Sequence, residues 1–181
     1  MNHLELLQWC LALIEEESDK EKFEALYRKY INLMHYKAHA ILKQQELAED
    51  AVSIALLSIA KNIRMVGEVS SERTQHYVMI ITQRSALNLL KKLKREEARF
   101  VTLEEAEQIA EEIKTNEEDG LTAAILNLPS PYKEVIILKY ADGYNNREIA
   151  VILNLTVANV EKIVSRGKKK LRKEISKGVF L

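Results

Sequence analysis

Residues 145–175, NNREIAVILNLTVANVEKIVSRGKKKLRKEI, decide the fold of the C-terminal part of the chain. Asn145, followed three residues later by Glu148, is typical of a capping box that begins a short helix. Asn154 stands where the chain needs a left-handed residue, and Thr156 is a candidate N-cap for a second helix. The stretch therefore predicts two helices joined by a tight turn, a helix-turn-helix.

The residues around this turn agree with the same interpretation. A small side chain at Ala150 lets the two helices approach, and Val160 is expected to hold the second helix against the first. Upstream, Ser130 is a candidate N-cap with Pro131 at the first helical position, and Gly143 is expected to end that helix. A further helix is therefore predicted immediately before the helix-turn-helix.

The second helix of the pair, from Thr156 to about Ile175, is strongly basic in its C-terminal half. If it enters a major groove, its first turns meet base edges and its basic half meets phosphates. The alternative is a solvated cationic face on an ordinary helical hairpin, but the joint pattern of caps and turn favours DNA binding. The candidate duplex-binding residues are Thr156, Val157, Ala158, Asn159, Glu161, Lys162, Ser165, Arg166, Lys168, Lys169 and Lys170.

The charges of the chain are segregated, although its formal net charge is zero. Residues 83–95 contain five basic side chains and no acidic one, whereas residues 96–120 contain ten acidic side chains and two basic ones. Residues 130–181 contain eleven basic and five acidic side chains. Such blocks of one sign predict a polyanionic partner for the two basic regions.

The composition predicts an all-α protein. The 181 residues include only five glycines and two prolines, while 47% are apolar and 30% charged, which indicates few and long helices. Apolar residues recur at helical spacing through the first half, including a long helix over about 71–98. We predict two helical domains, 1–100 and 118–181, joined by an acidic linker, 101–117.

The sequence offers no residues for an enzyme, a metal site or a cofactor. His35 and His39 lie one helical turn apart, but no third ligand stands at a suitable spacing. Cys10 is the single cysteine and lies in an apolar run, where an inert buried thiol is expected. The longest apolar stretch, from Trp9 to Ile14, is too short to cross a membrane. We expect a cytoplasmic protein without membrane insertion.

Four segments resemble the extracytoplasmic-function group of bacterial RNA polymerase sigma factors. The strongest is LPSPYKEVIILKYADGYNNREIAVILNLTVANVEKIVSRGKKKL, residues 128–171, which is similar to the promoter-binding C-terminal domain of that family. The N-terminal half contributes three shorter matches: FEALYRKY (23–30), LAEDAV (47–52) and LNLLKKLKRE (87–96). The order and spacing of these segments also agree with the family.

The resemblance implies a transcription initiation factor whose partners are core RNA polymerase, promoter DNA and an anti-sigma factor. The helix-turn-helix would read the minus-thirty-five element, and the N-terminal domain would bind polymerase and the minus-ten element. Tyr77 would stack on an unpaired base. The candidate minus-ten residues are Tyr77, Arg84, Asn88, Lys91, Lys92, Lys94 and Arg95. The candidate polymerase-binding residues are Glu49 and Asp50, which the resemblance implies, and Ser53 beside them.

The chain departs from the family pattern at functional places. Ser53 and Ile54 replace a Gln-Glu pair in the polymerase-binding segment, and Ile163 replaces a frequent Arg in the recognition helix. YVMIITQR, residues 77–84, stands where the family has a different minus-ten run, and Asn88 replaces an Asp. Two alternatives therefore stay open: a free-standing helix-turn-helix regulator, and an adaptor whose helical bundle meets another protein.

Overall fold

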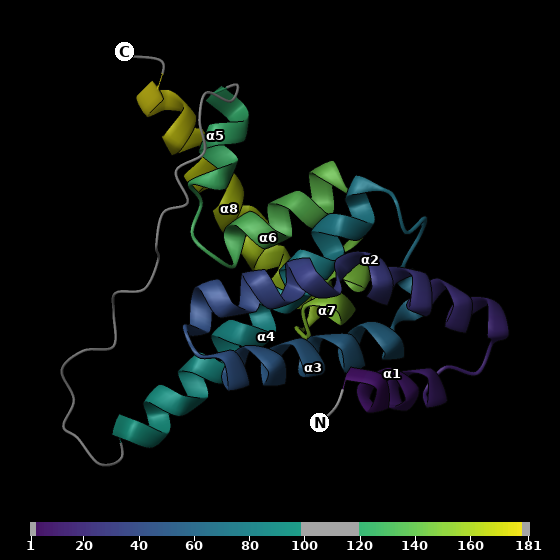
Figure 1. The fold of residues 1–181 in the computed structure, drawn as a ribbon. Coiled ribbons are helices and arrows are strands. Elements are labelled where there is room, and N and C mark those ends of the chain that lie inside the picture. Colours follow the sequence, from purple (N-terminus) through teal and green to yellow (C-terminus); the bar gives the residue numbers. More distant parts are fainter. Residues whose placement is uncertain (1–2, 99–119, 179–181) are drawn as a thin grey trace. The chain divides into compact units, whose positions relative to one another are not determined.

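The computed structural model describes residues 3–98 and 120–178, and every regular element in these ranges is a helix (Figure 1). The prediction of an all-α protein is confirmed for this part of the chain. Two compact units are present, Met1–Leu103 and Glu104–Leu181. The predicted linker at 101–117 lies outside the described residues. In the described ranges, no helix combines the length and the apolar character needed to cross a bilayer.

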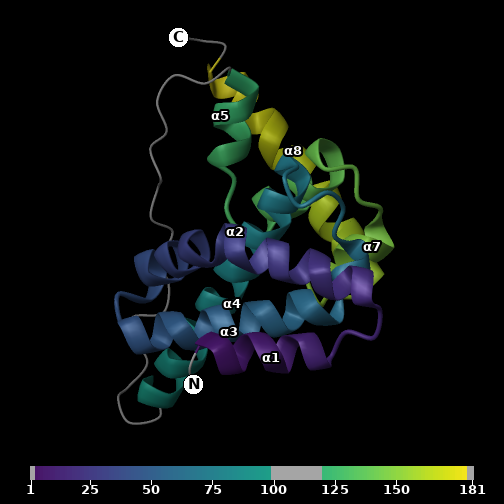
Figure 2. The ribbon, with the colours of Figure 1, turned by 45° about the vertical axis from the view of Figure 1, so that its right-hand side comes forward.

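Unit 1 is a helical bundle. α2, α3 and α4 pack against one another, and α1 lies beside α3 in both ribbon views (Figures 1 and 2). The prediction of a long helix over about 71–98 is confirmed, since α4 begins one residue later. The elements are α1 (His3–Ala12), α2 (Glu17–Leu42), α3 (Gln45–Lys61), the 3₁₀ turn η1 (Ile63–Met65) and α4 (Glu72–Ala98).

The core of unit 1 is built from one apolar face of each long helix, because apolar residues three or four positions apart share a helix face. Tyr30 of α2 adds a long-range bond, since its hydroxyl donates to the carbonyl of Val69 over 2.7 Å. This bond holds the segment before α4 against α2. The largest fully buried side chains of the unit are Phe23, Leu26, Met34, Val52, Leu56, Ile59, Tyr77 and Val78.

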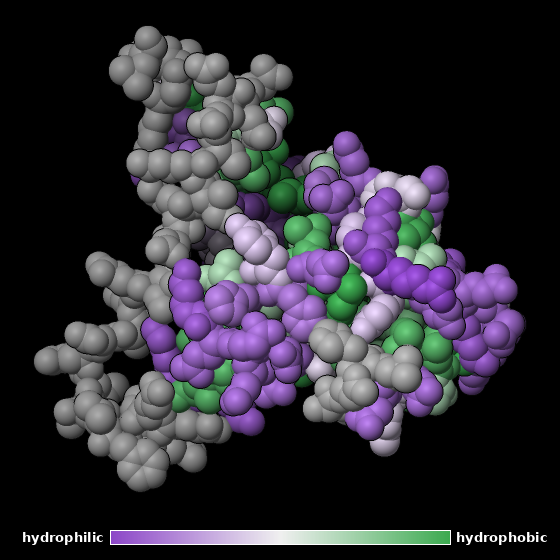
Figure 3. Space-filling view, viewed as in Figure 1, coloured by the Kyte–Doolittle hydropathy of each residue, from purple (hydrophilic) through white to green (hydrophobic). Residues whose placement is uncertain are grey.

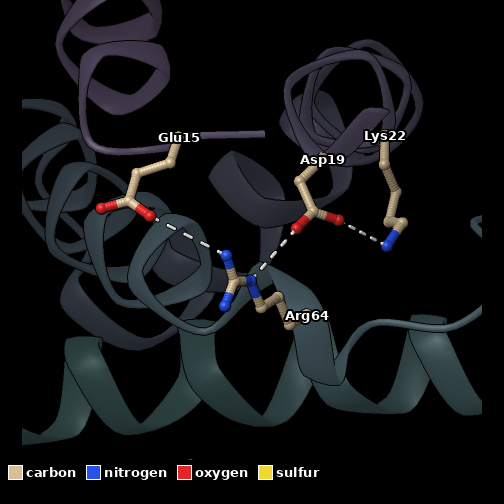
Figure 4. A network of polar contacts seen from close by, with 4 residues as sticks. All are labelled: Glu15, Asp19, Lys22 and Arg64. Atoms are coloured by element: carbon tan, nitrogen blue, oxygen red, sulfur yellow. Dashed lines mark hydrogen bonds and ion pairs between the residues drawn. The ribbon is translucent and has the colours of Figure 1, made fainter. Parts of the chain in front are cut away.

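A polar network holds the beginning of α2 near η1 (Figure 4). The carboxylate of Asp19 is almost buried and pairs with Lys22 Nζ over 2.9 Å and with Arg64 Nε over 3.7 Å. Arg64 Nη2 also lies 3.9 Å from the carboxylate of Glu15. Residues before α2, within it and after α3 are thereby linked through one guanidinium group.

Unit 2 is arranged around its last helix. α5, α6 and α7 each contact α8. Gly167 of α8 permits close packing with α6, because a Cβ built at this glycine would lie 3.3 Å from Ile136 Cγ1. The elements are α5 (Gly120–Leu126), α6 (Tyr132–Ile136), the π-helical turn η2 (Ile137–Ala141), α7 (Asn146–Ile152) and α8 (Val157–Gly178).

The beginning of α6 differs from the prediction, whereas its end agrees. Ser130 does not cap the helix: its hydroxyl donates to Glu134 Oε1 over 2.7 Å, and the helix begins at Tyr132. No side chain caps α6, and the serine hydroxyl acts as a donor to the carboxylate instead of accepting from a backbone N–H. Gly143 adopts a left-handed φ of 73°, so the prediction that this glycine ends the helical segment is confirmed.

Candidate nucleic-acid interface

The capping box predicted at the beginning of α7 is confirmed. Asn145 Oδ1 accepts hydrogen bonds from the backbone N–H groups of Arg147 (2.9 Å) and Glu148 (3.0 Å). Glu148 Oε2 in return accepts from the backbone N–H of Asn145 over 2.7 Å. These bonds satisfy backbone donors that the first helical turn leaves free, and they fix where α7 begins.

The turn between α7 and α8 also has the predicted geometry. Asn154 adopts φ 48°, in the left-handed region, and the following Leu155 N–H donates to the carbonyl of Ala150 over 2.8 Å. Thr156 Oγ1 accepts from the backbone N–H of Asn159 over 3.2 Å and so caps α8. Val160 is completely buried. The predicted helix-turn-helix is therefore present in the structure.

One side of α8 faces away from the rest of unit 2. Val160 and Gly167 are buried one above the other, and at 100° per residue the opposite side of the helix is set by Ala158, Lys162 and Lys169. We call this side the outer face; its exposed residues are Ala158, Glu161, Lys162, Ser165, Arg166, Lys169, Arg172, Lys173 and Ser176. The outer side of the first turns of α8 is thus free of the unit's own core, as a groove-binding helix requires, while Val160 on the opposite side is buried.

The seven cations of α8 from Lys162 to Lys173 fall into two groups. Lys168 Nζ lies 5.1 Å from the centre of the Tyr140 ring, and Lys170 Nζ lies 5.4 Å from that of Tyr132, so both are held by cation–π contacts. Within residues 3–98 and 120–178, no ion pair or side-chain hydrogen bond engages the other five, which are Lys162, Arg166, Lys169, Arg172 and Lys173. These five are available to an external anion.

A second cationic region lies at the C-terminal end of α4. The last turns of this helix extend beyond α2 and α3 in both ribbon views (Figures 1 and 2). Asn88 is exposed there, whereas Arg84 is only half-exposed and has interactions within its own unit. The structure thus brings most of the predicted minus-ten residues to one exposed helix end: Asn88, Lys91, Lys92, Lys94 and Arg95.

The structure contradicts the role predicted for Tyr77. The sequence placed it among the residues for an unpaired base, but its side chain is 0% exposed and lies in the core of unit 1. A ring without accessible faces cannot stack on a nucleobase, so the prediction is wrong for this structure. The apolar periodicity of α4 continues through this position, which is the signal that could have assigned it to the core.

The predicted polymerase-binding residues lie on α3. Glu49 and Asp50 are exposed, and Glu49 Oε1 accepts a hydrogen bond from Gln45 Nε2 over 2.9 Å. Ser53 donates its hydroxyl proton to the backbone carbonyl of Glu49 over 2.8 Å, so that proton is already engaged. Ile54, not included among the site residues predicted from sequence, is 49% exposed beside them. This surface of α3 is therefore acidic with one apolar residue.

The surface shown in Figure 3 is hydrophilic over most of its coloured area, with small apolar patches between.

The burial of Cys10 raises its pKa to about 11, so this thiol stays protonated and unreactive at neutral pH. In the described part of the chain, no group of three or more His, Cys, Asp or Glu side chains is arranged to hold a metal ion. Among the described residues of unit 1, the exposed large apolar side chains are Trp9, Leu13, Leu33, Tyr36 and Ile54.

The geometry of unit 2 defines a helix-turn-helix domain with an exposed cationic second helix. Comparison with known families gives the particular class: residues 119–171 match the family described as Sigma-70, region 4. This segment is therefore similar to that family, and the predicted resemblance to the extracytoplasmic-function sigma factors is confirmed for the same part of the chain by its similarity to one of them. That relative is the ECF RNA polymerase sigma factor SigW of Bacillus subtilis (strain 168), which is 45% identical over 51 residues. The alignment spans 28% of this chain and 27% of SigW.

Two solved structures are also similar to this chain. One is the sigma factor RpoE in complex with the anti-sigma factor NepR from Bartonella quintana, with 18% identity and a TM-score of 0.43; the match covers 86% of this chain and 98% of that one. The other is CnrH in complex with the cytosolic domain of CnrY, with 16% identity and a TM-score of 0.39, covering 94% and 95% of the two chains.

Proposed function

We propose that the protein is a transcription initiation factor of the sigma class, which joins core RNA polymerase and directs it to particular promoters. The observation that carries this proposal is the exposed outer face of α8 within the segment that matches Sigma-70, region 4. The protein acts as a regulatory binding factor in the cytoplasm, and its own residues select the DNA rather than perform the polymerase chemistry.

Unit 2 binds the minus-thirty-five element. The 22 residues of α8 give a helix about 33 Å long, and the major groove is wide enough to admit it. The first two turns, from Val157 to Ser165, reach base edges. The unpaired cations Arg166, Lys169 and Lys173 follow them toward the phosphates, where each neutralised phosphate releases condensed counterions and strengthens binding.

Unit 1 supplies a second DNA contact and the polymerase contact. The exposed cations near the end of α4, Lys91 to Arg95, support binding to the minus-ten element. The acidic surface at Glu49 and Asp50 of α3 supports binding to a basic surface of core polymerase, with Ile54 adding an apolar contact. Two weak DNA contacts on one chain strengthen each other, because the second forms at a high effective concentration.

A free-standing helix-turn-helix regulator is the second candidate. The observation that favours it is the state of α3, where the Ser53 hydroxyl bonds to the backbone and Ile54 presents a methyl surface. Fewer polar groups then remain for a polymerase contact. In this case the protein would bind its duplex equally well in the presence and absence of polymerase.

Run-off transcription distinguishes the two candidates. The purified full chain and bacterial core polymerase are mixed with a library of promoter fragments, and transcript starts are compared with those of core polymerase alone. The proposal expects new starts that depend on the chain and share two sequence elements. Identical starts with and without the chain would contradict it, and a duplex shift by the chain alone in that case would establish the regulator.

A charge-reversal pair tests the role of α3. Glu49→Lys combined with Asp50→Lys is expected to abolish chain-dependent starts while the outer face of α8 still binds duplex DNA. The matched control is Glu21→Lys combined with Glu72→Lys, which reverses two exposed carboxylates on α2 and α4. Equal loss in both double variants would mean that net charge, and not the α3 surface, determines activity.

A further inference from the structure

Glu161 is an exposed carboxylate on a helix that otherwise presents cations. It follows the first turn of α8, on the exposed side, and its nearest neighbours on that side are Ala158 and Ser165. No hydrogen bond or ion pair of its side chain occurs within the described residues. The carboxylate is therefore solvated and free to meet an external group.

Stabilisation of the helix does not account for this carboxylate. On a helix, ion pairs form between residues three or four positions apart, and the residues at these distances from Glu161 are Val157, Ala158, Val164 and Ser165. None of them is charged, although α8 carries seven basic residues between Lys162 and Lys173. The helix dipole acts mainly within the first turn, and Glu161 follows that turn.

Nonspecific attraction to DNA does not account for it either. A carboxylate beside a phosphate is repelled, so Glu161 weakens binding wherever it faces the DNA backbone. It contributes favourably only where it meets a hydrogen-bond donor on a base edge. In the major groove, guanine and thymine present acceptors, and the amino donors belong to cytosine N4 and adenine N6. The adenine amino group lies beside the N7 acceptor, which repels a carboxylate, so cytosine is the best partner.

We propose that Glu161 is a specificity-determining residue that accepts a hydrogen bond from a cytosine N4 amino group in the duplex site of α8. This inference rests on the proposed function, since it assigns the base that one residue of the same interface reads. The small side chains at Ala158 and Ser165 allow the groove floor to approach Glu161 closely. At that base pair the carboxylate selects cytosine and rejects guanine and thymine through repulsion between acceptors.

The test uses the full chain with bacterial core polymerase and a randomised duplex upstream of a fixed start region, followed by sequencing of the bound fragments. The natural chain is expected to enrich a site with one required cytosine. Changing that base pair is expected to lower relative affinity by roughly fivefold to a hundredfold, the range for a good base contact.

Two variants at this position test the base preference: one is expected to shift it and the other to remove it. Glu161→Gln keeps the shape of the side chain but places an amide there, which pairs best with adenine N6 and N7, so the preference moves from cytosine to adenine. Glu161→Ala removes the preference. Loss of the negative charge raises affinity for all duplexes alike, and this effect cancels in the ratio of affinities for two base pairs.

Lys173→Ala is the matched control, because this exposed cation lies on the same helix but far from its first turns. It is expected to lower affinity evenly for all sequences. An enriched site without a required cytosine, or an unchanged preference in Glu161→Gln, would overturn the assignment while leaving the proposed function intact. Absence of any enriched site and of any chain-dependent start would overturn both.

Discussion

The two cationic regions of the molecule are placed by different kinds of interaction. The beginning of α8 is set by bonds between residues close in sequence: the left-handed Asn154 and the Thr156 cap directly precede it, and the Asn145 capping box begins the helix before it. The position of α4 is set by residues remote in sequence. Tyr77 is buried in the core that α4 forms with α2 and α3, and the Tyr30 hydroxyl holds the segment before α4.

This difference explains for which residues the sequence could predict whether the side chain is exposed or buried. Caps and left-handed turns have short and specific patterns, so the outer face of α8 could be deduced from a single stretch of sequence. Helical periodicity indicates the apolar face of α4, and Tyr77 lies on it, but the resemblance to a DNA-binding family assigned this aromatic residue to the surface instead. Exposure was therefore predicted correctly for α8 and incorrectly for Tyr77.

The largest effect is expected from Tyr77→Ala. Removing a fully buried aromatic side chain leaves a cavity and should destabilise unit 1 by about 3–5 kcal/mol. Native-state hydrogen exchange would show faster exchange throughout α2, α3 and α4, with unit 2 unchanged. Tyr77→Phe keeps the ring and is expected to retain most of the stability. A Tyr77→Ala variant with unchanged exchange in unit 1 would contradict burial as the role of this residue.

Asn154→Val is expected to have the next largest effect. A β-branched residue at φ 48° is strained, and the cost should be about 1–3 kcal/mol within unit 2. Exchange of the α7 and α8 amides should accelerate, sequence-specific duplex binding should weaken, and unit 1 should be unaffected. Asn154→Gly is the control, because glycine adopts this φ without strain. If both variants bind duplex equally well, the turn does not position α8.

Other differences between sequence and structure have the same physical origin. Ser130 has the pattern of a cap, but the nearby Glu134 carboxylate takes its hydroxyl proton. Ser53 is polar by sequence, but its hydroxyl bonds to the preceding turn of its own helix. In each case the hydroxyl donates to a partner that the sequence pattern did not identify. The sequence identifies the polar residues, whereas the three-dimensional arrangement determines which hydrogen-bond partner each hydroxyl meets.

Removing two outer-face cations should change the salt dependence of DNA binding. Arg166→Ala combined with Lys169→Ala is expected to reduce the slope of log affinity against log salt concentration by about two, roughly one for each lost phosphate contact. Lys170 is a less suitable choice, because it lies over the Tyr132 ring. Duplex binding of the full chain at several salt concentrations measures the slope.

The same measurement compares the two cationic regions directly. Lys91→Ala combined with Lys94→Ala should leave the slope for a minus-thirty-five duplex unchanged, because these residues lie on α4. The same pair should reduce the slope for a polymerase complex on a promoter that includes the minus-ten element. An equal slope change on the isolated duplex for both double variants would mean that the cations act only through net charge.

The smallest effect is expected from Arg64→Ala, which removes the shared member of the network in unit 1. Its side chain is 70% exposed and lies 3.7 Å from Asp19 and 3.9 Å from Glu15, so solvent and salt screen both pairs. The loss in stability should be about 0.2–1 kcal/mol and should shrink as salt concentration rises. Hydrogen exchange in the first turns of α2 measures it.

Arg28→Ala is the matched control, because Arg28 forms an ion pair with Glu24 within α2 alone. Both variants remove an exposed arginine from one ion-paired site, but only Arg64 joins segments distant in sequence. If long-range contacts position unit 1, Arg64→Ala should accelerate exchange both at the beginning of α2 and around η1, whereas Arg28→Ala should affect only the turn around itself. Identical local effects would mean that apolar burial alone, without this network, positions the helices of unit 1.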